Sequence, residues 1–227
     1  MKKIALSIII LFYFTINVSS HVDHYADFNY LEYELFRNNK SIGYHKYNFF
    51  RDNDILSVKS EVNFKITKLG VDLYSYFAES EEIYKNDQFF EFKSKTNQNK
   101  KEKYVNINVN KTTNDLTIDG SSYKGNTSKN SIVGTWWNHE IVKTNKQISA
   151  ISGRVIEQTV NFVGKEQIKI GGKTYNALHF NFKSSDVALP VNKKLNTDIW
   201  YDEKTLLWLK TSFDKSGYWE YRLKNFN

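Results

Sequence analysis

The fold is decided by one stretch of the chain, Ile55-Leu56-Ser57-Val58-Lys59-Ser60-Glu61-Val62-Asn63-Phe64-Lys65-Ile66. Apolar side chains of one parity alternate here with polar and charged ones. The apolar set is Leu56, Val58, Val62, Phe64 and Ile66. A period of two places the sets on opposite faces of an extended strand, one buried and one in contact with solvent. Because parallel strands are buried on both faces, this pattern indicates an antiparallel sheet.

Similar alternating runs recur along the rest of the chain, separated by clusters of Asn, Asp, Gly and Ser that are typical of turns. The runs cover residues 28–37, 42–51, 71–84, 88–96, 104–109, 155–162, 167–170, 173–182, 198–202, 206–213 and 218–226. Connections this short join antiparallel neighbours. The Gly171-Gly172 pair is the clearest signal for a two-residue hairpin.

Three segments lack this period. Residues 184–196, which contain Pro190, and residues 121–130 have the composition of loops. Residues 131–149 fit no strand pattern, and one short helical segment is a possible structure for them. This last segment separates two sets of strands, but each set alone would expose an apolar face. We therefore expect an all-β fold, a single curved antiparallel sheet that closes into an open or half-open barrel with long loops.

The first twenty residues have the layout of a secretory signal peptide. Lys2 and Lys3 precede an apolar run at 4–14, and Val18-Ser19-Ser20 supplies small residues for cleavage. Such a run is shorter than the roughly 20 residues that a membrane-spanning helix needs. We predict a signal peptide at 1–20, a single β domain at 21–227, a periplasmic or secreted localisation, and no integral membrane segment after cleavage.

Charge and composition narrow the function. The chain has no cysteine, which excludes disulfides and thiolate metal sites. Its net charge is +7, and its lysines are interleaved with acids except in the run Lys100-Lys101-Glu102-Lys103. That distribution favours ordinary solvated charge and no nucleic-acid partner. Phosphate-binding, dinucleotide-binding and hydrolase motifs are absent from the sequence, so we expect no cofactor and favour a binding protein over an enzyme.

Several phrases resemble a family of uncharacterised exported bacterial proteins, the DUF6134 type, which is related in style to DUF3108. The resemblance begins at residues 33–45, continues at Trp136-Trp137-Asn138 and closes with Ile199-Trp200-Tyr201-Asp202, Leu207 and residues 217–221. It implies a secreted or periplasmic antiparallel β protein, of a half-open barrel kind similar to lipoprotein-carrier folds. It carries over no catalytic residue.

Two groups of residues are candidates for a ligand site. The cluster Trp136-Trp137-Asn138-His139 could floor a pocket, with aromatic surface and a few polar contacts. Alternatively, one tryptophan fills the core and the polar pair caps a turn. His45 follows Gly43 in a strand and is either a ligand contact or a packing residue. Trp200 and Tyr201, just before a turn at Asp202, complete the predicted ligand-binding set.

The aromatic content of 16% favours a protein that binds a hydrophobic or amphipathic ligand, such as a lipid, in the concave face of the sheet. One alternative is an envelope structural or protein-interaction module that uses sheet edges or exposed aromatic patches. A less favoured alternative is a hydrolase acting on envelope material, with His139 or His45 working beside Asp202.

Overall fold

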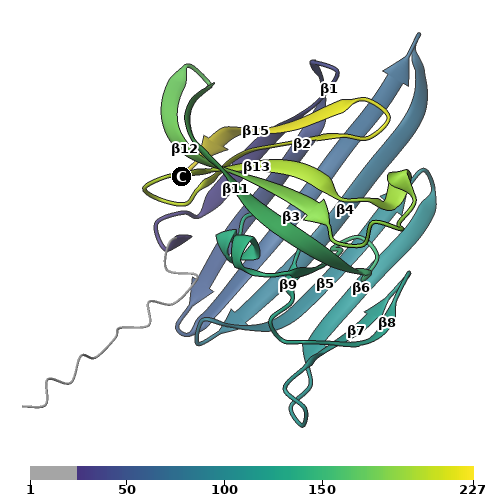
Figure 1. Cartoon of the computed structure of the whole chain (residues 1–227), viewed down its shortest axis with the longest axis vertical. Coiled ribbons are helices and arrows are strands. Elements are labelled where there is room, and N and C mark those ends of the chain that lie inside the picture. The colour runs from purple at the N-terminus through teal and green to yellow at the C-terminus, as the bar shows by residue number, and fades with distance from the viewer. Residues whose placement is uncertain (1–24) are drawn as a thin grey trace, which may run out of the picture.

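The computed structural model describes residues 25–227, so the expected signal peptide at 1–20 lies outside the described residues. The described chain forms one curved sheet with the strand order β8-β7-β6-β5-β4-β3-β2-β1-β15-β14-β13-β12-β11-β10-β9 (Figure 1). The strands are β1 (Tyr30–Arg37), β2 (Lys40–Asp52), β3 (Ile55–Lys68), β4 (Val71–Lys85), β5 (Gln88–Gln98), β6 (Lys101–Val109), β7 (Leu116–Gly120), β8 (Lys124–Thr127), β9 (Ile132–Val133), β10 (Lys146–Ile148), β11 (Val155–Ile170), β12 (Lys173–Ser184), β13 (Asn196–Asp202), β14 (Trp208–Asp214) and β15 (Tyr218–Phe226).

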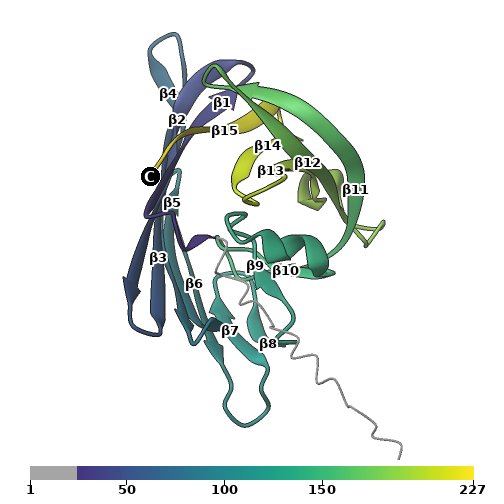
Figure 2. The same ribbon diagram turned by 90° about the vertical axis from the view of Figure 1, so that its left-hand side faces the viewer.

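The sheet forms an open barrel. The first and last strands of the chain lie next to each other in the middle of the strand order. Strand β1 pairs with both β2 and β15, so the N-terminal and C-terminal halves meet there. From that seam the sheet curves around in both directions, and its two outer strands, β8 and β9, belong to consecutive parts of the chain (Figure 2). Residues 131–151, called here the interior segment, lie between the two halves and carry β9, the 3-10 helix η2 (His139–Lys143) and β10.

The turns form where the sequence places them. Both residues of Asn38-Asn39, Asn86-Asp87 and Gly171-Gly172 have positive φ, between 47° and 81°. Two successive positive-φ residues give the tight turn whose twist matches antiparallel strands, and Asn, Asp and Gly tolerate that conformation best. The predicted antiparallel architecture, with one helical turn in residues 131–149, is confirmed.

The prediction was incomplete in three places. Residues 121–130, expected to be a loop, include β8, and the short strands β7, β9 and β10 were missed. The elements β8, β9 and β10, of two to four residues, have no apolar alternation in the sequence, while β7 alternates only at Leu116 and Ile118. Residues 155–162 and 167–170 form one strand, β11, which passes through a bulge near Gly164. Strands β9 and β10 pair in parallel, which the long connection through η2 makes possible.

The inward face of β3 is the one that the sequence predicts. Leu56, Val58, Val62 and Phe64 are buried there, while Ile66, nearer the turn, is half-buried. A second apolar cluster joins the inner face of β5–β7 to the interior segment through Val133 and Ile148. The interior segment therefore covers apolar surface that an open sheet would otherwise expose. Within the described residues, no helix combines the length and the apolar character required to cross a membrane.

Two substitutions on β3 test this register. Phe64 is buried and stacks on Tyr76 at 4.9 Å between ring centroids, so Phe64→Ala should cost about 3 to 5 kcal/mol of unfolding free energy. Glu61 faces the other way and accepts a hydrogen bond from the Tyr44 hydroxyl at 2.5 Å. Glu61→Lys should cost less than about 1 kcal/mol. Denaturant unfolding measures both, and a larger loss for Glu61→Lys would show that the register is wrong.

Candidate functional site

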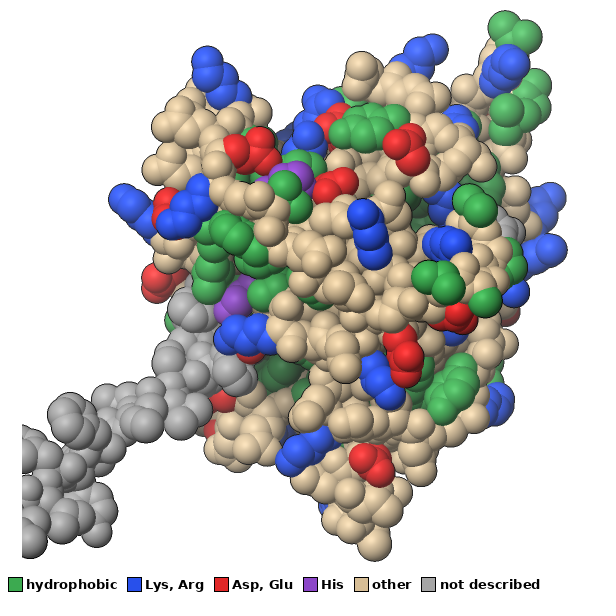
Figure 3. Space-filling view, viewed as in Figure 1, with side chains coloured by type: hydrophobic (Ala, Val, Ile, Leu, Met, Phe, Trp, Pro, Cys, Tyr) green, Lys and Arg blue, Asp and Glu red, His purple; other side chains and the backbone are tan. Residues whose placement is uncertain are grey.

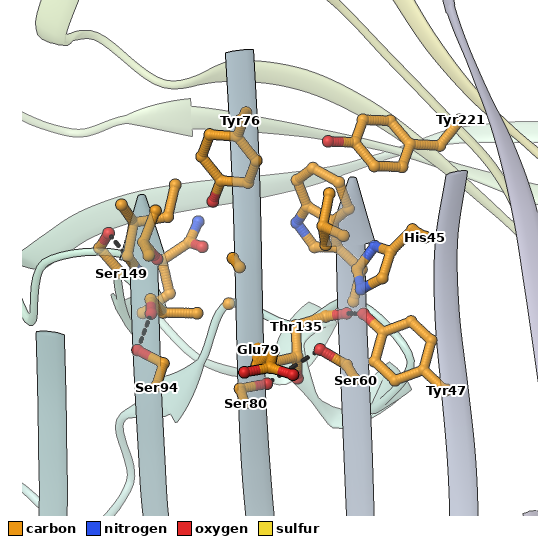
Figure 4. Close-up of a pocket in the computed structure, with 18 of the residues that line it drawn as sticks. His45, Tyr47, Ser60, Tyr76, Glu79, Ser80, Ser94, Thr135, Ser149 and Tyr221 are labelled. Atoms are coloured by element: carbon orange, nitrogen blue, oxygen red, sulfur yellow. Dashed lines mark hydrogen bonds between the residues drawn. The ribbon is translucent and has the colours of Figure 1, made fainter. Parts of the chain in front are cut away.

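A cavity of about 190 Å³ lies inside the barrel, between the inner face of β2–β5 and the interior segment. His45, Tyr76 and Tyr221 point toward this space from β2, β4 and β15 (Figure 4). Gly134, Trp136, Gln147 and Ala150 of the interior segment line the opposite side. Strands from both halves of the chain therefore meet the interior segment around one partly open cavity.

A row of three serines creates room for the cavity. Ser60, Ser80 and Ser94 lie directly opposite one another on β3, β4 and β5, on the inward parity. The Ser60 and Ser80 hydroxyls hydrogen-bond at 2.9 Å, and Ser94 donates to the Ala150 carbonyl oxygen at 2.5 Å (Figure 4). The inward row on one side carries Val58, Glu82 and Phe92, and the row on the other side carries Val62, Ala78 and Thr96, with Phe64 and Tyr76 beyond it. Small side chains in one row therefore leave an unfilled layer with hydroxyl groups on its floor.

His45 is the most unusual side chain in the cavity wall. Only 8% of it is exposed, and neither ring nitrogen has a hydrogen-bond partner among residues 25–227. Burial lowers the pKa of His45 to about 3, so the imidazole is neutral at pH 7. Its nearest ring neighbour is Tyr47, at 4.3 Å between centroids. A neutral imidazole offers one donor and one acceptor, and leaving both buried and unpaired costs stability.

The position of His45 is set by Gly43. These residues share the inward parity of β2, and Gly43 sits opposite Phe64 on β3. A Cβ atom at Gly43 would lie 2.0 Å from the Asn63 carbonyl oxygen, so only glycine permits this approach of the two strands. The close approach holds the strand carrying His45 against the aromatic core.

The two adjacent tryptophans of the interior segment point to different places. Trp136 has φ of 62°, a left-handed conformation that is uncommon for a bulky residue. Its ring packs on Trp208 and Tyr221 at the cavity wall. The Trp137 ring is 1% exposed and packs edge-on against Tyr25 in the core. One member of the pair thus lines the cavity and the other fills the core.

A buried carboxylate fixes this arrangement. Glu82 lies on the inner face of β4 and is 2% exposed. It accepts hydrogen bonds from the Tyr84 hydroxyl at 2.5 Å, the Trp137 indole nitrogen at 3.0 Å and the Thr135 hydroxyl at 3.2 Å. Burial raises the pKa of Glu82 to about 6, and the three hydrogen bonds limit that rise. Two of the three donors belong to the interior segment, so Glu82 ties that segment to the sheet.

Other predicted residues serve this attachment. Asn138 caps η2 by accepting from the Glu140 amide at 3.0 Å, and its side chain donates to the Tyr84 hydroxyl at 3.1 Å. His139 is buried, with Nε2 at 3.1 Å from a Glu140 oxygen. The Tyr201 hydroxyl donates to the Trp136 carbonyl oxygen at 2.8 Å. These contacts hold the interior segment in place on the side away from the cavity.

Trp200 lies apart from the cavity. It is next to Tyr201 in β13, and adjacent residues of a strand face opposite sides of the sheet. Its ring stacks on His179 on the outer face, at 4.2 Å between centroids, and its indole nitrogen donates to Glu166 at 2.5 Å. The predicted ligand-binding set therefore divides: His45 and Trp136 line the cavity, Trp137, Asn138, His139 and Tyr201 lie behind its wall, and Trp200 lies outside.

Sequence reasoning missed Glu82, Tyr76 and the serine row. A signal for Glu82 was present, because it shares the parity of Tyr74, Tyr76 and Tyr84 in the alternating run 71–84. A carboxylate on the apolar parity of a strand must find buried donors. Tyr84, two positions away, is one such donor, but nothing in the local pattern identifies the other two, which lie more than fifty positions away in the chain.

The residues of the hydrolase alternative, His139 or His45 beside Asp202, do not come together around the cavity. One Asp202 oxygen accepts from the Lys204 and Thr205 amides at 3.1 and 2.9 Å, as expected for a residue that caps a turn. Neither Asp202 nor His139 lines the cavity that His45 faces.

The raised pKa of Glu82 predicts a specific pH dependence of stability. Between pH 4.5 and about 6 the folded state holds a proton that the unfolded state has lost, so the unfolding free energy falls as pH rises through this window. At ~1.4 kcal/mol per pH unit, the fall contributed by Glu82 is about 2 kcal/mol. Glu82→Gln should lack this contribution. Denaturant unfolding at pH 4.5 and pH 7 measures the difference, with the exposed Glu79→Gln as control. Parallel pH profiles for the wild type and Glu82→Gln would contradict the assignment.

Comparison with known proteins agrees with this architecture. The crystal structure of a beta-barrel-like protein of domain of unknown function DUF1849 from Brucella abortus aligns with a TM-score of 0.59 and 11% sequence identity, over 87% of this chain and 96% of that one. At this identity, the likeness shows the fold alone. No curated protein matches the sequence. The family model described as Domain of unknown function (DUF6134) matches residues 33–224. The chain therefore belongs to the DUF6134 family.

Proposed function

We propose that the protein is an exported binding protein whose barrel interior holds a small, uncharged, amphipathic ligand in the His45 cavity. The observation that carries the proposal is the pair of unpartnered ring nitrogens on a buried histidine that lines this cavity. Native structures rarely leave buried polar atoms unpaired, and such atoms commonly have a functional reason. A ligand hydroxyl, carbonyl or amide would complete the hydrogen bonding of His45.

The ring side chains of the wall favour a neutral ligand, and the one carboxylate of the lining, Glu79, lies on the opposite parity of β4 and is exposed. Burial keeps His45 neutral and raises the pKa of Tyr76 to about 12, so neither group is charged at pH 7. Burial also raises the pKa of Tyr221. An ion entering this space would lose its hydration without gaining a counter-charge from these groups, which is costly. Hydroxyl and imidazole groups instead suit a polar, uncharged end of a ligand.

The size of the cavity limits what it encloses. A cavity of roughly 150 Å³ lined by apolar side chains can hold a benzene ring, so about 190 Å³ accommodates one substituted ring or the end of an aliphatic chain. A lipid would place only one end in the cavity, with the rest extending out of the barrel. The signal-like N-terminal sequence supports export, and a lipid or another envelope compound is then a ligand available to the protein.

Small probes of one-ring size test the proposal. Phenol and benzyl alcohol should raise the melting temperature of protein refolded from denaturant, while benzoate should not, because its carboxylate would be buried unpaired. Native mass spectrometry of protein taken directly from the producing cells should detect a copurifying small molecule. The proposal is wrong if no such molecule is found and none of the uncharged probes shifts the melting temperature.

Two variants separate a ligand contact from a packing residue. His45→Phe should raise the melting temperature of ligand-free protein by about 2 to 4 °C, because it removes unpaired buried polar atoms worth roughly 1 kcal/mol, and should abolish the response to phenol. Tyr47→Phe is the matched control. Its hydroxyl donates to the Thr135 carbonyl oxygen, so the variant should be less stable yet still respond to phenol. Loss of stability in His45→Phe would instead indicate a structural role for the histidine.

A further inference from the structure

The turn between β3 and β4 presents an apolar surface at one end of the barrel. Leu69 at the turn is 95% exposed, and Val71 and Leu73 on β4 are 61% and 55% exposed. Hydrophobic and basic side chains gather at the upper right tip in Figure 3, where Figure 1 places this hairpin. Single exposed apolar residues are ordinary, but three within five positions on a projecting hairpin form a patch of the kind found at binding surfaces.

Lysines surround this patch. Lys65 and Lys68 lie on β3 beside the turn, and Lys100 and Lys101 lie at the neighbouring turn between β5 and β6. Lys65 pairs with Asp72 at 3.1 Å. Across residues 25–227, Lys68, Lys100 and Lys101 have no carboxylate within 4.0 Å. The run at 100–103, the one local concentration of basic residues in the sequence, thus adds its charge to the apolar hairpin.

Hydrogen bonds hold the basic turn beside β4, at Ser75, six positions from Leu69. The Ser75 amide donates to the Asn99 side-chain oxygen at 2.8 Å, and the Asn99 amide donates to the Ser75 carbonyl oxygen at 2.9 Å. The apolar hairpin and the basic turn therefore lie at the same end of the barrel in a fixed relation. The hairpin tip reaches beyond the basic turn, which lies beside the base of the hairpin.

We propose that this end of the barrel docks onto an anionic phospholipid bilayer. Leu69, Val71 and Leu73 enter the interface between headgroups and acyl chains, and the unpaired lysines contact the negative headgroups. Charge complementarity identifies the partner, since burial of apolar side chains combined with attraction of lysines to anionic lipid is how peripheral proteins bind membranes. The proposal does not depend on the interior cavity.

A tryptophan reporter at the tip tests the docking. The full-length Leu69→Trp variant is mixed with phosphatidylcholine vesicles that contain phosphatidylglycerol. Its tryptophan emission should shift to the blue on mixing, by more than that of the wild type. Brominated lipid should quench this emission. Val187→Trp is the control, because Val187 is 84% exposed on the loop between β12 and β13. The proposal requires no shift there. An unshifted Leu69→Trp signal, or an equal shift in both variants, would overturn it.

The lysines are tested in the same assay. In the Leu69→Trp background, Lys68→Glu, Lys100→Glu and Lys101→Glu together should weaken binding to phosphatidylglycerol-containing vesicles roughly tenfold or more, since each basic residue near the surface adds to the attraction. Vesicles of phosphatidylcholine alone should bind the parent protein weakly, and salt should weaken the anionic binding. Equal binding to neutral and anionic vesicles would contradict the proposed partner. Melting temperatures should stay within a few degrees of the parent, because all three positions are exposed.

Discussion

The structure depends on the buried carboxylate of Glu82 and its three donors. A carboxylate on the inner face of a sheet is tolerated only if hydrogen bonds replace the water it loses. Tyr84 supplies one such bond from the same strand, and Thr135 and Trp137 supply the others from the interior segment. The requirement to satisfy Glu82 therefore fixes where the interior segment crosses the barrel, and with it which apolar surface of the open sheet is covered.

The cavity follows from the same arrangement. Trp137 is held toward Glu82 and the core, so the left-handed residue Trp136 turns its ring the other way, toward the space that His45 faces. The row of serines on β3–β5 leaves that space unfilled. The interior segment crosses the barrel once. That crossing leaves a packed core on one side of the segment and an unfilled layer on the other. A protein built only for stability would fill this layer and pair the imidazole, which is why we propose that His45 contacts a ligand.

Local patterns predicted the strands, their buried faces and the turns, because period two and Asn-Asn or Gly-Gly pairs act over a few residues. The pair Trp200-Tyr201 shows how far that logic extends: neighbours in a strand cannot share a site on one face, so the strand prediction alone separates them. The parallel pair β9–β10 was not predictable, because two or three residues show no period. The partners of Glu82 and the alignment of the serines depend on the register of distant strands.

The central claim is that Glu82 and Trp137 stabilise the fold through their mutual hydrogen bond, and a double-mutant cycle tests it directly. Glu82→Gln keeps the side-chain shape and removes the charge, whereas Trp137→Phe removes the indole donor together with part of the ring, a loss of volume that the cycle subtracts. The unfolding free energies of the wild type, the two single variants and the double variant give the coupling between the residues. The account predicts a coupling of about 1 to 3 kcal/mol at pH 7, in the range for residues that share a buried hydrogen-bond network. Additive effects, within about 0.5 kcal/mol, would contradict it.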